Sequence, residues 1–566
     1  MGAHEPARFL APAFPPRSLR TVILSFIATC FFFSFYRLSR IPEAAYYPHY
    51  IYDHIANYFE PGIVNNTLYQ NGTEAAVHPH WNFSEPCHGF PSTRDIMVVM
   101  KTGATESFDK MPTQLLTSLQ CIPDFLLFSD LEQQIGKYHI YNVLDRVQDV
   151  LTSDRAEFRL YQAQLDCPIS QKECTNDMPG GWDLDKYKFL NMVVRTWEMR
   201  PARKWYVFVE ADTYVVWSNL VNWLNTQMDP TKDIYVGGVA FLNNMPFAHG
   251  GSGYAISGVL LERLVAHVKD IPPKRLNEMA INTCCGDALL ADVIDNLAVS
   301  VLRASPMFNN EKPNTFPFSP HDWCQPLFTL HHVNSEEVSG VWQYEQTRTK
   351  TEPMQLRDLY HAFVAPNIVP RRPRWNNLAE QRCLAKPDDG DNVVEKHAHE
   401  SPEACARVCL AEGLNLDTHA YEGLKTDDER DWYLHQRYRH QSSDPNKPSK
   451  ERTCFSWRYR DGRCCTSDSF RLGYPVAAKK EPDATSGWFV DGINRWIHDH
   501  GQCPNGTEWV TPTCVGKWCP EELEKHRKQM DDDRKANEAM LKKFGPTPGH
   551  DDSKGDAGAG NTDALR

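Results

Sequence analysis

The strongest constraint on the fold is an alternation of short apolar runs and helix-like segments between about residues 92 and 345. Runs this short and continuous are typical of parallel strands that are buried on both faces. A segment with apolar residues at helical spacing, residues 187–197, precedes the last of them. Residues 92–375 are therefore predicted to form an α/β domain with these strands: Ile96–Met100, Phe125–Phe128, His139–Leu144 and Trp205–Val209.

Length and composition limit the class of protein. A chain of 566 residues is too long for one compact core, so we expect at least two domains. A hydrophobic content of 41% with 15 Trp indicates a folded protein. The net charge of −13 gives no basic excess for a polyphosphate backbone, which argues against nucleic acid as a partner.

An uncharged apolar stretch, residues 21–36, predicts a membrane anchor. As a helix it would be roughly 24 Å long, which suits the thinner early secretory membranes. A cleaved signal peptide is the alternative, but Arg37-Leu-Ser-Arg40 follows instead of a small-x-small cleavage site. We expect a type II protein of the Golgi membrane, or of the ER, with a cytoplasmic tail (1–20), a stem (37–91) and a lumenal catalytic domain.

Sequons and cysteines agree with a lumenal body. Four Asn-x-Ser/Thr sequons predict glycosylation at Asn65, Asn71, Asn82 and Asn505. Of 17 Cys, only Cys30 lies in the apolar stretch, and the remaining even set fits an oxidising compartment.

The sequence pattern changes after about residue 375. Nine Cys fall in residues 380–519, where the strand–helix alternation ends. This region predicts a small disulfide-rich α+β module whose connectivity the sequence leaves open. Residues 520–566 form a charged tail, with a helix expected over 520–543 and disorder at its end.

Two carboxylates with one residue between them, Glu210 and Asp212, follow the predicted strand Trp205–Val209. Ligands of open α/β sheets gather at the carboxyl ends of strands. A sugar nucleotide releases a charged diphosphate, and a divalent cation on carboxylate oxygens can hold that charge. Oxygen ligands suit Mn²⁺ or Mg²⁺, and an added imidazole favours Mn²⁺. An ordinary helix cap is the alternative for such an acid pair.

Three more motifs follow in order along the chain. His249–Ser257 is a glycine-dense turn before a helix, where backbone can approach a ligand closely. Asp287 opens a predicted helix, as an N-cap or as a general base for an acceptor hydroxyl. His331 and His332 end an apolar run, and alternation along a strand would point only one of them into a site.

This order of segments resembles glycosyltransferase family 31, especially its Fringe and core 1 β1,3-galactosyltransferase branches. The shared pattern is an acidic triplet after a strand, a Gly-Gly-x-Gly-Tyr turn, an acidic pair that opens a helix, and a later His. The resemblance covers roughly residues 92–345. It implies a GT-A nucleotide-diphospho-sugar fold, Mn²⁺ (or Mg²⁺), a UDP-sugar donor, a glycan or glycoprotein acceptor, and inverting transfer that forms mostly β1,3 linkages.

The resemblance also assigns roles to residues. Asp212 matches the acid that binds the metal, Glu210 lies near the metal or the ribose, and Asp287 matches the base. His331 is the preferred metal histidine, with His332 a close competitor and Glu311 the Fringe-like alternative. The remaining expected contacts are those to the nucleotide, Lys101, Thr102 and Asp130, and those to the acceptor, Gly250, Gly251, Gly253 and Tyr254.

Two departures from the family pattern support a rival hypothesis. Ala211 and Gly286 each stand where the family has an acid. A catalytically inactive, membrane-anchored glycan-binding or chaperone-like protein would tolerate both changes. The cysteine-rich module resembles PAN/apple domains through Cys405-x-x-x-Cys409, Cys454-Phe-Ser-Trp457 and Cys464-Cys465, which implies a possible protein or glycan partner.

Overall fold

The computed structural model describes residues 86–145, 147, 154–319, 321–348, 352–412, 418–426, 429–430, 432–434, 454–477 and 479–544. The chain divides into two units, Met1–Pro79 with Asn415–Asp444, and His80–Leu414 with Pro445–Arg566. The predicted anchor, most of the stem, residues 545–566 and the sequons at Asn65, Asn71 and Asn82 lie outside the described residues. Among the helices of the described part, none has the length and apolar character to span a bilayer.

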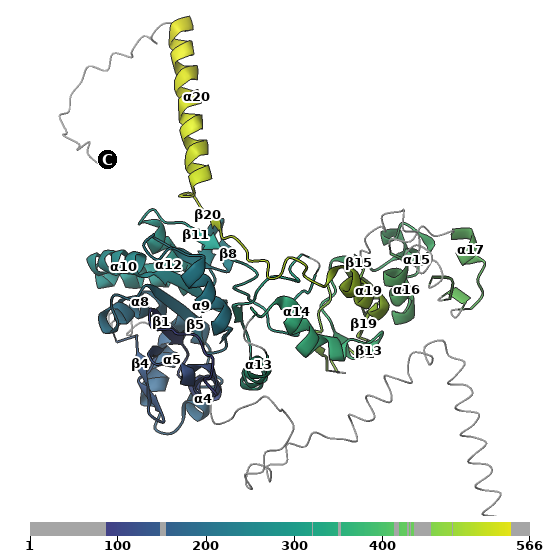
Figure 1. Cartoon of the computed structure of the whole chain (residues 1–566), viewed down its shortest axis with the longest axis horizontal. Coiled ribbons are helices and arrows are strands. Elements are labelled where there is room, and N and C mark those ends of the chain that lie inside the picture. The colour runs from purple at the N-terminus through teal and green to yellow at the C-terminus, as the bar shows by residue number, and fades with distance from the viewer. Residues whose placement is uncertain are drawn as a thin grey trace, which may run out of the picture. The chain divides into compact units, whose positions relative to one another are not determined.

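A mixed sheet forms the centre of the second unit (Figure 1). Its strands β5, β1, β2 and β4 are parallel, whereas β10 runs antiparallel between β5 and β7. The described strands follow the order β20 (Thr513–Val515), β11 (Val301–Arg303), β7 (Tyr235–Gly237), β10 (Tyr254–Ser257), β5 (Trp205–Glu210), β1 (Ile96–Lys101), β2 (Phe125–Ser129), β4 (Tyr138–Asn142) and β3 (Gln133–Ile135).

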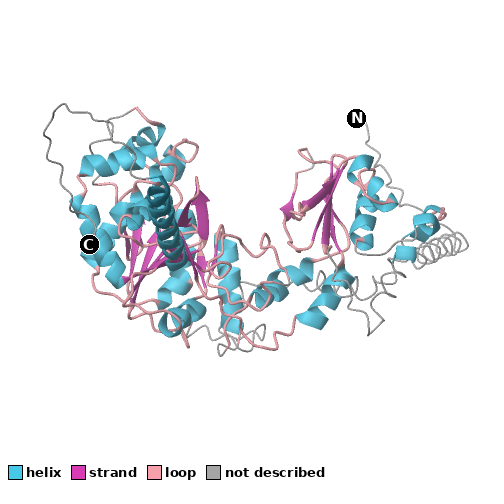
Figure 2. Cartoon of the chain, turned by 90° about the horizontal axis from the view of Figure 1, so that it is seen from above, coloured by secondary structure: helices cyan, strands magenta, loops and turns pink. Residues whose placement is uncertain are grey.

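Helices cover both faces of this sheet, as Figure 2 shows for the magenta strands among cyan helices. Alternate residues of β1 serve the two faces: Met97 and Val99 pack into one core, and Val98 and Met100 into the other. The first core takes side chains from α5 (Ala156–Asp166), α8 (Lys188–Met199), α10 (Gly258–Asp270) and α12 (Gly286–Asp295). The second takes them from α4 (Ser107–Leu116) and α9 (Trp217–Thr226). Burial on both faces explains the continuous apolar runs of the sequence.

The carboxyl ends of the parallel strands meet at one edge. Lys101 at the end of β1 lies in register with Glu210 at the end of β5, and with Phe128 of β2. The segments that follow these strands, beginning at Thr102, Asp130 and Ala211, therefore lie side by side. The polar residues that the sequence places after these strands are therefore close to one another at this edge.

Smaller elements complete the α/β region. A two-stranded sheet of β6 (Tyr214–Val215) and β12 (Thr329–Leu330) brings distant segments together. Within the glycine-dense segment His249–Ser257, the last four residues form strand β10. Helix α10 follows directly at Gly258, as the sequence predicted. The other elements are α6 (Gln171–Cys174), α7 (Gly181–Asp185), β8 (Val239–Leu242), β9 (Met245–Ala248), α11 (Pro273–Asn282), α13 (Ser335–Thr347) and α14 (Leu356–Leu359).

The cysteine-rich region forms a five-stranded antiparallel sheet with helices, which agrees with the predicted α+β module. Its strand order is β13 (Arg372–Pro373), β19 (Thr485–Trp488), β16 (Ser456–Arg460), β17 (Arg463–Ser467) and β15 (Arg382–Leu384). Helix α16 (Pro402–Ala411) is tied to it by Cys405–Cys464 and Cys409–Cys454. The other elements of this region are α15 (Val393–Lys396), α19 (Val490–His500) and the strand pair β14 (Trp375–Asn376) and β18 (Tyr474–Pro475). Helix α17 (Thr418–Glu422) belongs to the other unit. The PAN/apple resemblance itself stays a prediction.

The described cysteines all form disulfides, which gives the connectivity that the sequence left open. The pairs are Cys87–Cys121, Cys167–Cys174, Cys284–Cys285, Cys324–Cys503, Cys383–Cys465, Cys405–Cys464, Cys409–Cys454 and Cys514–Cys519. After the module the chain returns to the α/β sheet, because β20 pairs with β11 at its edge. The predicted terminal helix is present as α20, Pro520–Phe544.

Candidate active site

Asp212, His331 and His332 form a cluster at the carboxyl edge of the sheet, called here the Asp–His cluster. One ligand atom from each of the three lies within 4.8 Å of the others. Asp212 Oδ1 is 3.5 Å from His331 Nε2, and Asp212 Oδ2 is 4.0 Å from His332 Nδ1. The set combines one carboxylate with two imidazoles, a donor combination that suits Mn²⁺ better than Ca²⁺ or Mg²⁺.

The β6–β12 pair explains how residues so far apart in the sequence meet. Leu330 lies opposite Tyr214, so the chain segments at His331 and Asp212 leave the small sheet side by side. The Val333 amide then donates a hydrogen bond to the Asp212 carbonyl (3.1 Å). His332 has a φ of +60°, which breaks the strand alternation and stacks its ring on that of His331. Both imidazoles therefore face Asp212, contrary to the prediction that only one would.

The surroundings of the Asp–His cluster fit a metal site. Asn310 Oδ1 accepts a hydrogen bond from His331 Nδ1 (2.8 Å), and His331 Nε2 faces Asp212. Second-sphere acceptors of this kind orient metal-binding histidines. Asp212 Oδ1 is buried without a hydrogen-bond partner. Burial raises the pKa of Asp212, but the neighbouring His331 and the Lys110 ammonium outweigh it, so that the pKa lies well below its ordinary value and the group is a carboxylate.

The glycine-dense turn supports these groups. A Cβ at Gly251 would lie 2.1 Å from His331 Cε1, so the imidazole packs directly on the glycine backbone. The Gly251 carbonyl accepts a hydrogen bond from Thr213 Oγ1 (2.7 Å). Gly250 and Gly253 are buried, and Tyr254 is 1% exposed, with its ring stacked on Phe208. This burial does not fit the predicted acceptor contact of these four residues; the turn shapes the site from behind.

Asp287 lies in the first turn of α12 and contacts the same glycine-dense turn. Its Oδ2 accepts a hydrogen bond from the Gly250 amide (2.8 Å) and its Oδ1 from the Ala288 amide (2.9 Å). Burial raises the pKa of Asp287, more than these hydrogen bonds and the nearby His249 lower it. A carboxylate with a raised pKa and no ammonium partner is suited to accept a proton.

Behind this edge, two lysines and three acids form a buried chain of charges, called here the lysine–carboxylate network. Lys188 Nζ lies 3.3 Å from Asp130 Oδ1 and 3.2 Å from Asp185 Oδ1. Lys101 pairs with Asp185 and, at 3.1 Å, with Glu210 Oε1. Lys101 and Lys188 are 5% and 2% exposed, so each ammonium depends on these partners.

The lysine–carboxylate network changes the roles expected for the predicted nucleotide contacts. Asp130 is 2% exposed and also accepts hydrogen bonds from the Ala104 amide (2.7 Å) and Gln164 Nε2 (2.7 Å). Thr102 is 3% exposed, and its carbonyl accepts a hydrogen bond from Lys188 Nζ (2.9 Å). Asp130, Thr102 and Lys101 thus hold the strand ends internally. Glu210, predicted as a metal ligand, pairs with Lys101 and stands outside the Asp–His cluster.

Comparison with known families agrees with this arrangement. Residues 183–365 match the model of the Fringe-like family. This region of the chain is similar to that family. The match contains β5, Asp212, the glycine turn, Asp287 and the adjacent histidines, and the mixed α/β sheet fits the expected GT-A fold. No curated protein was found to match the chain.

Similarity to the Fringe-like family points to a glycosyltransferase. The matched region, residues 183–365, is shorter than the resemblance predicted from the sequence, which covered roughly residues 92–345. Residues 92–182, with Lys101, Thr102 and Asp130, precede the match. The structure buries these three residues in internal contacts. The residues brought together at the sheet edge, Asp212 and Asp287, lie inside the match.

The departures from the family pattern have physical explanations in the Fringe-like region. The Ala211 side chain is 3% exposed and packs in the apolar core beneath the sheet, so an acid there would face that core. A Cβ at Gly286 would lie 2.2 Å from the Phe189 ring. Phe189 also packs on Gly250 and lies 4.8 Å from Lys101 Nζ. Sequence reasoning missed Phe189, because its apolar position on α8 looks like ordinary core.

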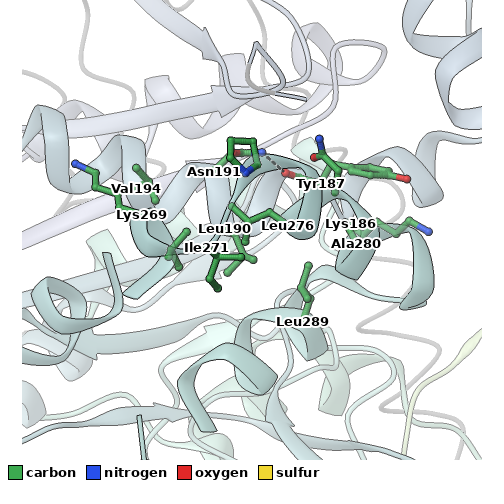
Figure 3. Close-up of a pocket in the computed structure, with 13 residues that line it drawn as sticks. Lys186, Tyr187, Leu190, Asn191, Val194, Lys269, Ile271, Leu276, Ala280 and Leu289 are labelled. Atoms are coloured by element: carbon green, nitrogen blue, oxygen red, sulfur yellow. Dashed lines mark hydrogen bonds between the residues drawn. The ribbon is translucent and has the colours of Figure 1, made fainter. Parts of the chain in front are cut away.

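A separate cavity of about 190 Å³ lies between α8, α10, α11 and α12 (Figure 3). Its wall is mostly apolar, with Leu190, Leu276 and Leu289 among the lining residues. In Figure 3 Asn191 bonds back to the Tyr187 carbonyl, so its amide serves its own helix. None of the predicted site residues lines this cavity.

Proposed function

We propose that the protein is an inverting, Mn²⁺-dependent glycosyltransferase. It moves a hexose or N-acetylhexosamine from a UDP-sugar to a hydroxyl of a glycan or glycoprotein, with formation of a β1,3 linkage. One observation carries the proposal: an acid–imidazole cluster and a separate buried carboxylate contact the same glycine turn. His331 of the cluster packs on Gly251, and Asp287 accepts a hydrogen bond from the Gly250 amide.

Asp287 is the base in this mechanism. It takes the proton of the acceptor hydroxyl while that oxygen bonds to the anomeric carbon and the bond to the diphosphate breaks. Attack from the face opposite the leaving group inverts the configuration without a covalent enzyme intermediate. The amides of Gly250 and Ala288 fix the orientation of the carboxylate, and burial raises its pKa towards the range of an effective base.

Asp212, with His331 and His332, would hold the divalent ion, whose chemistry is to neutralise charge on the departing diphosphate. The Asn310 side chain orients the His331 ring, and Gly251 provides the space that the ring occupies. Glu210 is a partly exposed member of the lysine–carboxylate network, with its side chain 27% exposed, and we assign it to the donor ribose.

The rival hypothesis, an inactive glycan-binding or chaperone-like protein, loses part of its motivation. It rested on Ala211 and Gly286. At Ala211 the side chain packs in the core, and at Gly286 the Phe189 ring takes the space. Neither change removes a group from the Asp–His cluster or displaces Asp287.

The setting of the reaction is also a proposal. Eight disulfides among the described residues support an oxidising compartment. Asn505, the sequon that lies in the described part, is exposed as glycosylation requires. With the predicted anchor at residues 21–36, we infer a type II protein of the Golgi membrane, or of the ER, whose cysteine-rich module contacts a protein or glycan.

The test is Mn²⁺-dependent hydrolysis or transfer across a panel of UDP-sugars. We expect activity with at least one donor, its loss on chelation, and a fall of about 100-fold or more in kcat/KM for Asp212→Asn. Asp166→Asn, an exposed acid on α5, is the matched control and should match the wild type. Undiminished activity of Asp212→Asn would refute the metal assignment, and binding of glycan without turnover of any donor would favour the rival hypothesis.

A further inference from the structure

Lys110 of α4 places a positive charge on the proposed metal ligand. Its Nζ lies 3.0 Å from Asp212 Oδ2 and 2.6 Å from Glu106 Oε2. Glu106 precedes Lys110 by one helical turn, and its side chain is 45% exposed, against 15% for Asp212. Lys110 therefore has one partner in the site and another at the surface. It precedes the Fringe-like match, and nothing in the family pattern assigned it a role.

The ammonium and a divalent ion compete for the same carboxylate. Asp212 Oδ2, the oxygen that Lys110 holds, is also the one nearest His332 Nδ1. Two like charges a few ångströms apart repel each other strongly at a partly buried site. A lysine side chain is long and flexible, so it can move off Asp212 while the helix stays in place. Glu106, already in contact, can keep the displaced ammonium.

Charge balance links this exchange to the donor. Asp212, Glu106 and Lys110 together carry one net negative charge, and a divalent ion changes the sum to one positive charge. A diphosphate would then meet two cationic groups, the ion and Lys110. Binding of the ion and of the diphosphate would each favour the other, which is a coupling between ligands.

We propose that Lys110 is a tethered cation that competes with the divalent ion for Asp212 and, once displaced, pairs with Glu106 and the diphosphate of the donor. This proposal rests on the proposed function, since it assumes that Asp212 binds the ion. It gives Lys110 two opposite effects: it weakens binding of the ion alone and strengthens binding of the nucleotide with the ion.

The experiment measures Mn²⁺ affinity of the purified full chain from the free-Mn²⁺ spin resonance signal, and UDP affinity by calorimetry at saturating Mn²⁺. For Lys110→Met we expect Mn²⁺ affinity without nucleotide to rise about tenfold or more, and UDP affinity to fall about tenfold. Lys110→Arg keeps the charge and should stay near the wild type. Glu106→Gln should lower Mn²⁺ affinity, because Lys110 then has only Asp212 as its partner.

Lys172→Met is the matched control. Lys172 of α6 is exposed and pairs with Asp109 of α4 at 3.2 Å, so its replacement removes a positive charge beside α4 without removing a contact to Asp212. Mn²⁺ binding that Asp212→Asn abolishes but Lys110→Met leaves within about twofold of the wild type would overturn this inference alone. Raised Mn²⁺ affinity with unchanged UDP affinity would overturn the pairing with the diphosphate. Absence of Mn²⁺ binding in the wild type and in Lys110→Met would overturn both the inference and the proposed function.

Discussion

Asp130 and Asp287 are both buried at the carboxyl edge of the same sheet, yet their pKa values move in opposite directions. Burial raises the pKa of each, but at Asp130 the Lys188 ammonium and hydrogen bonds from Ala104 and Gln164 outweigh it, so the pKa is lowered. At Asp287 two backbone amides and a histidine do not outweigh burial, so the pKa is raised. The nearby ammonium makes the difference between a structural anion and a potential base.

Asp212 lies between these two cases. It has an ammonium neighbour, Lys110, but shares it with Glu106 and keeps one buried oxygen without a hydrogen bond. The lysine–carboxylate network is internally paired, whereas the Asp–His cluster is not. An acid at a strand end is therefore a candidate ligand when its own protein leaves part of it unpaired.

Asp287→Asn should produce the largest effect, because it removes the proposed base. We expect kcat to fall by about 10²–10⁴-fold with little change in Mn²⁺ affinity. In the wild type the base must be ionised, so the rate should fall as the pH falls through the raised pKa of Asp287. That midpoint should lie above the ordinary value of 3.8. Initial rates across a pH series measure both kcat and the midpoint of the pH–rate profile.

The comparison would break if Asp130→Asn lowered kcat as strongly at full stability, since the network would then take part in the chemistry. It would also break if Asp287→Asn retained the wild-type rate and pH profile. The first outcome would make Asp130 the base. The second would assign that role to an acid other than Asp287.

Asp130→Asn should have the next largest effect, on stability. It leaves Lys188 buried with one fewer counter-ion, and we expect the free energy of unfolding to fall by about 3 kcal/mol. Because the folded pKa of Asp130 is lowered, its contribution is present above about pH 3.8 and is lost as the pH falls below it. The difference between variant and wild type in urea unfolding should therefore shrink in acid. The exposed Asp166→Asn should unfold like the wild type, and an equal loss there would contradict the special role of the network.

Local sequence pattern predicted the strands well and placed Asp212 just after one of them. Ile96–Met100 and Trp205–Val209 are apolar because both faces of the sheet are covered, and strands of this kind end where a ligand edge begins. That made Asp212 a good candidate without knowledge of its partners. The helix of residues 187–197 was likewise visible from its periodicity and is present as α8.

Long-range partners could not be predicted in the same way. Lys110 lies 102 residues from Asp212, and Lys188 lies 58 residues after Asp130, so no local spacing connects them. Asp130 and Asp212 looked alike as polar residues after strands, and only their ammonium partners separate them. Both histidines face Asp212 because His332 has a left-handed backbone conformation. The residue types at this position do not predict that conformation.

Gly251→Ala should give the smallest effect and tests whether the Asp–His cluster depends on its backing turn. The new methyl group would lie 2.1 Å from His331 Cε1, so the ring must move away from Asp212. We expect Mn²⁺ affinity to fall about tenfold and the free energy of unfolding by about 1–3 kcal/mol, because a packed site is overfilled. The matched control is Gly340→Ala in α13, where the nearest atom would lie 3.9 Å away and no loss is expected. Wild-type Mn²⁺ affinity in Gly251→Ala would show that His331 can shift without loss of binding or is not a ligand. Asp212 and His332 would then be the remaining candidate ligands of the Asp–His cluster.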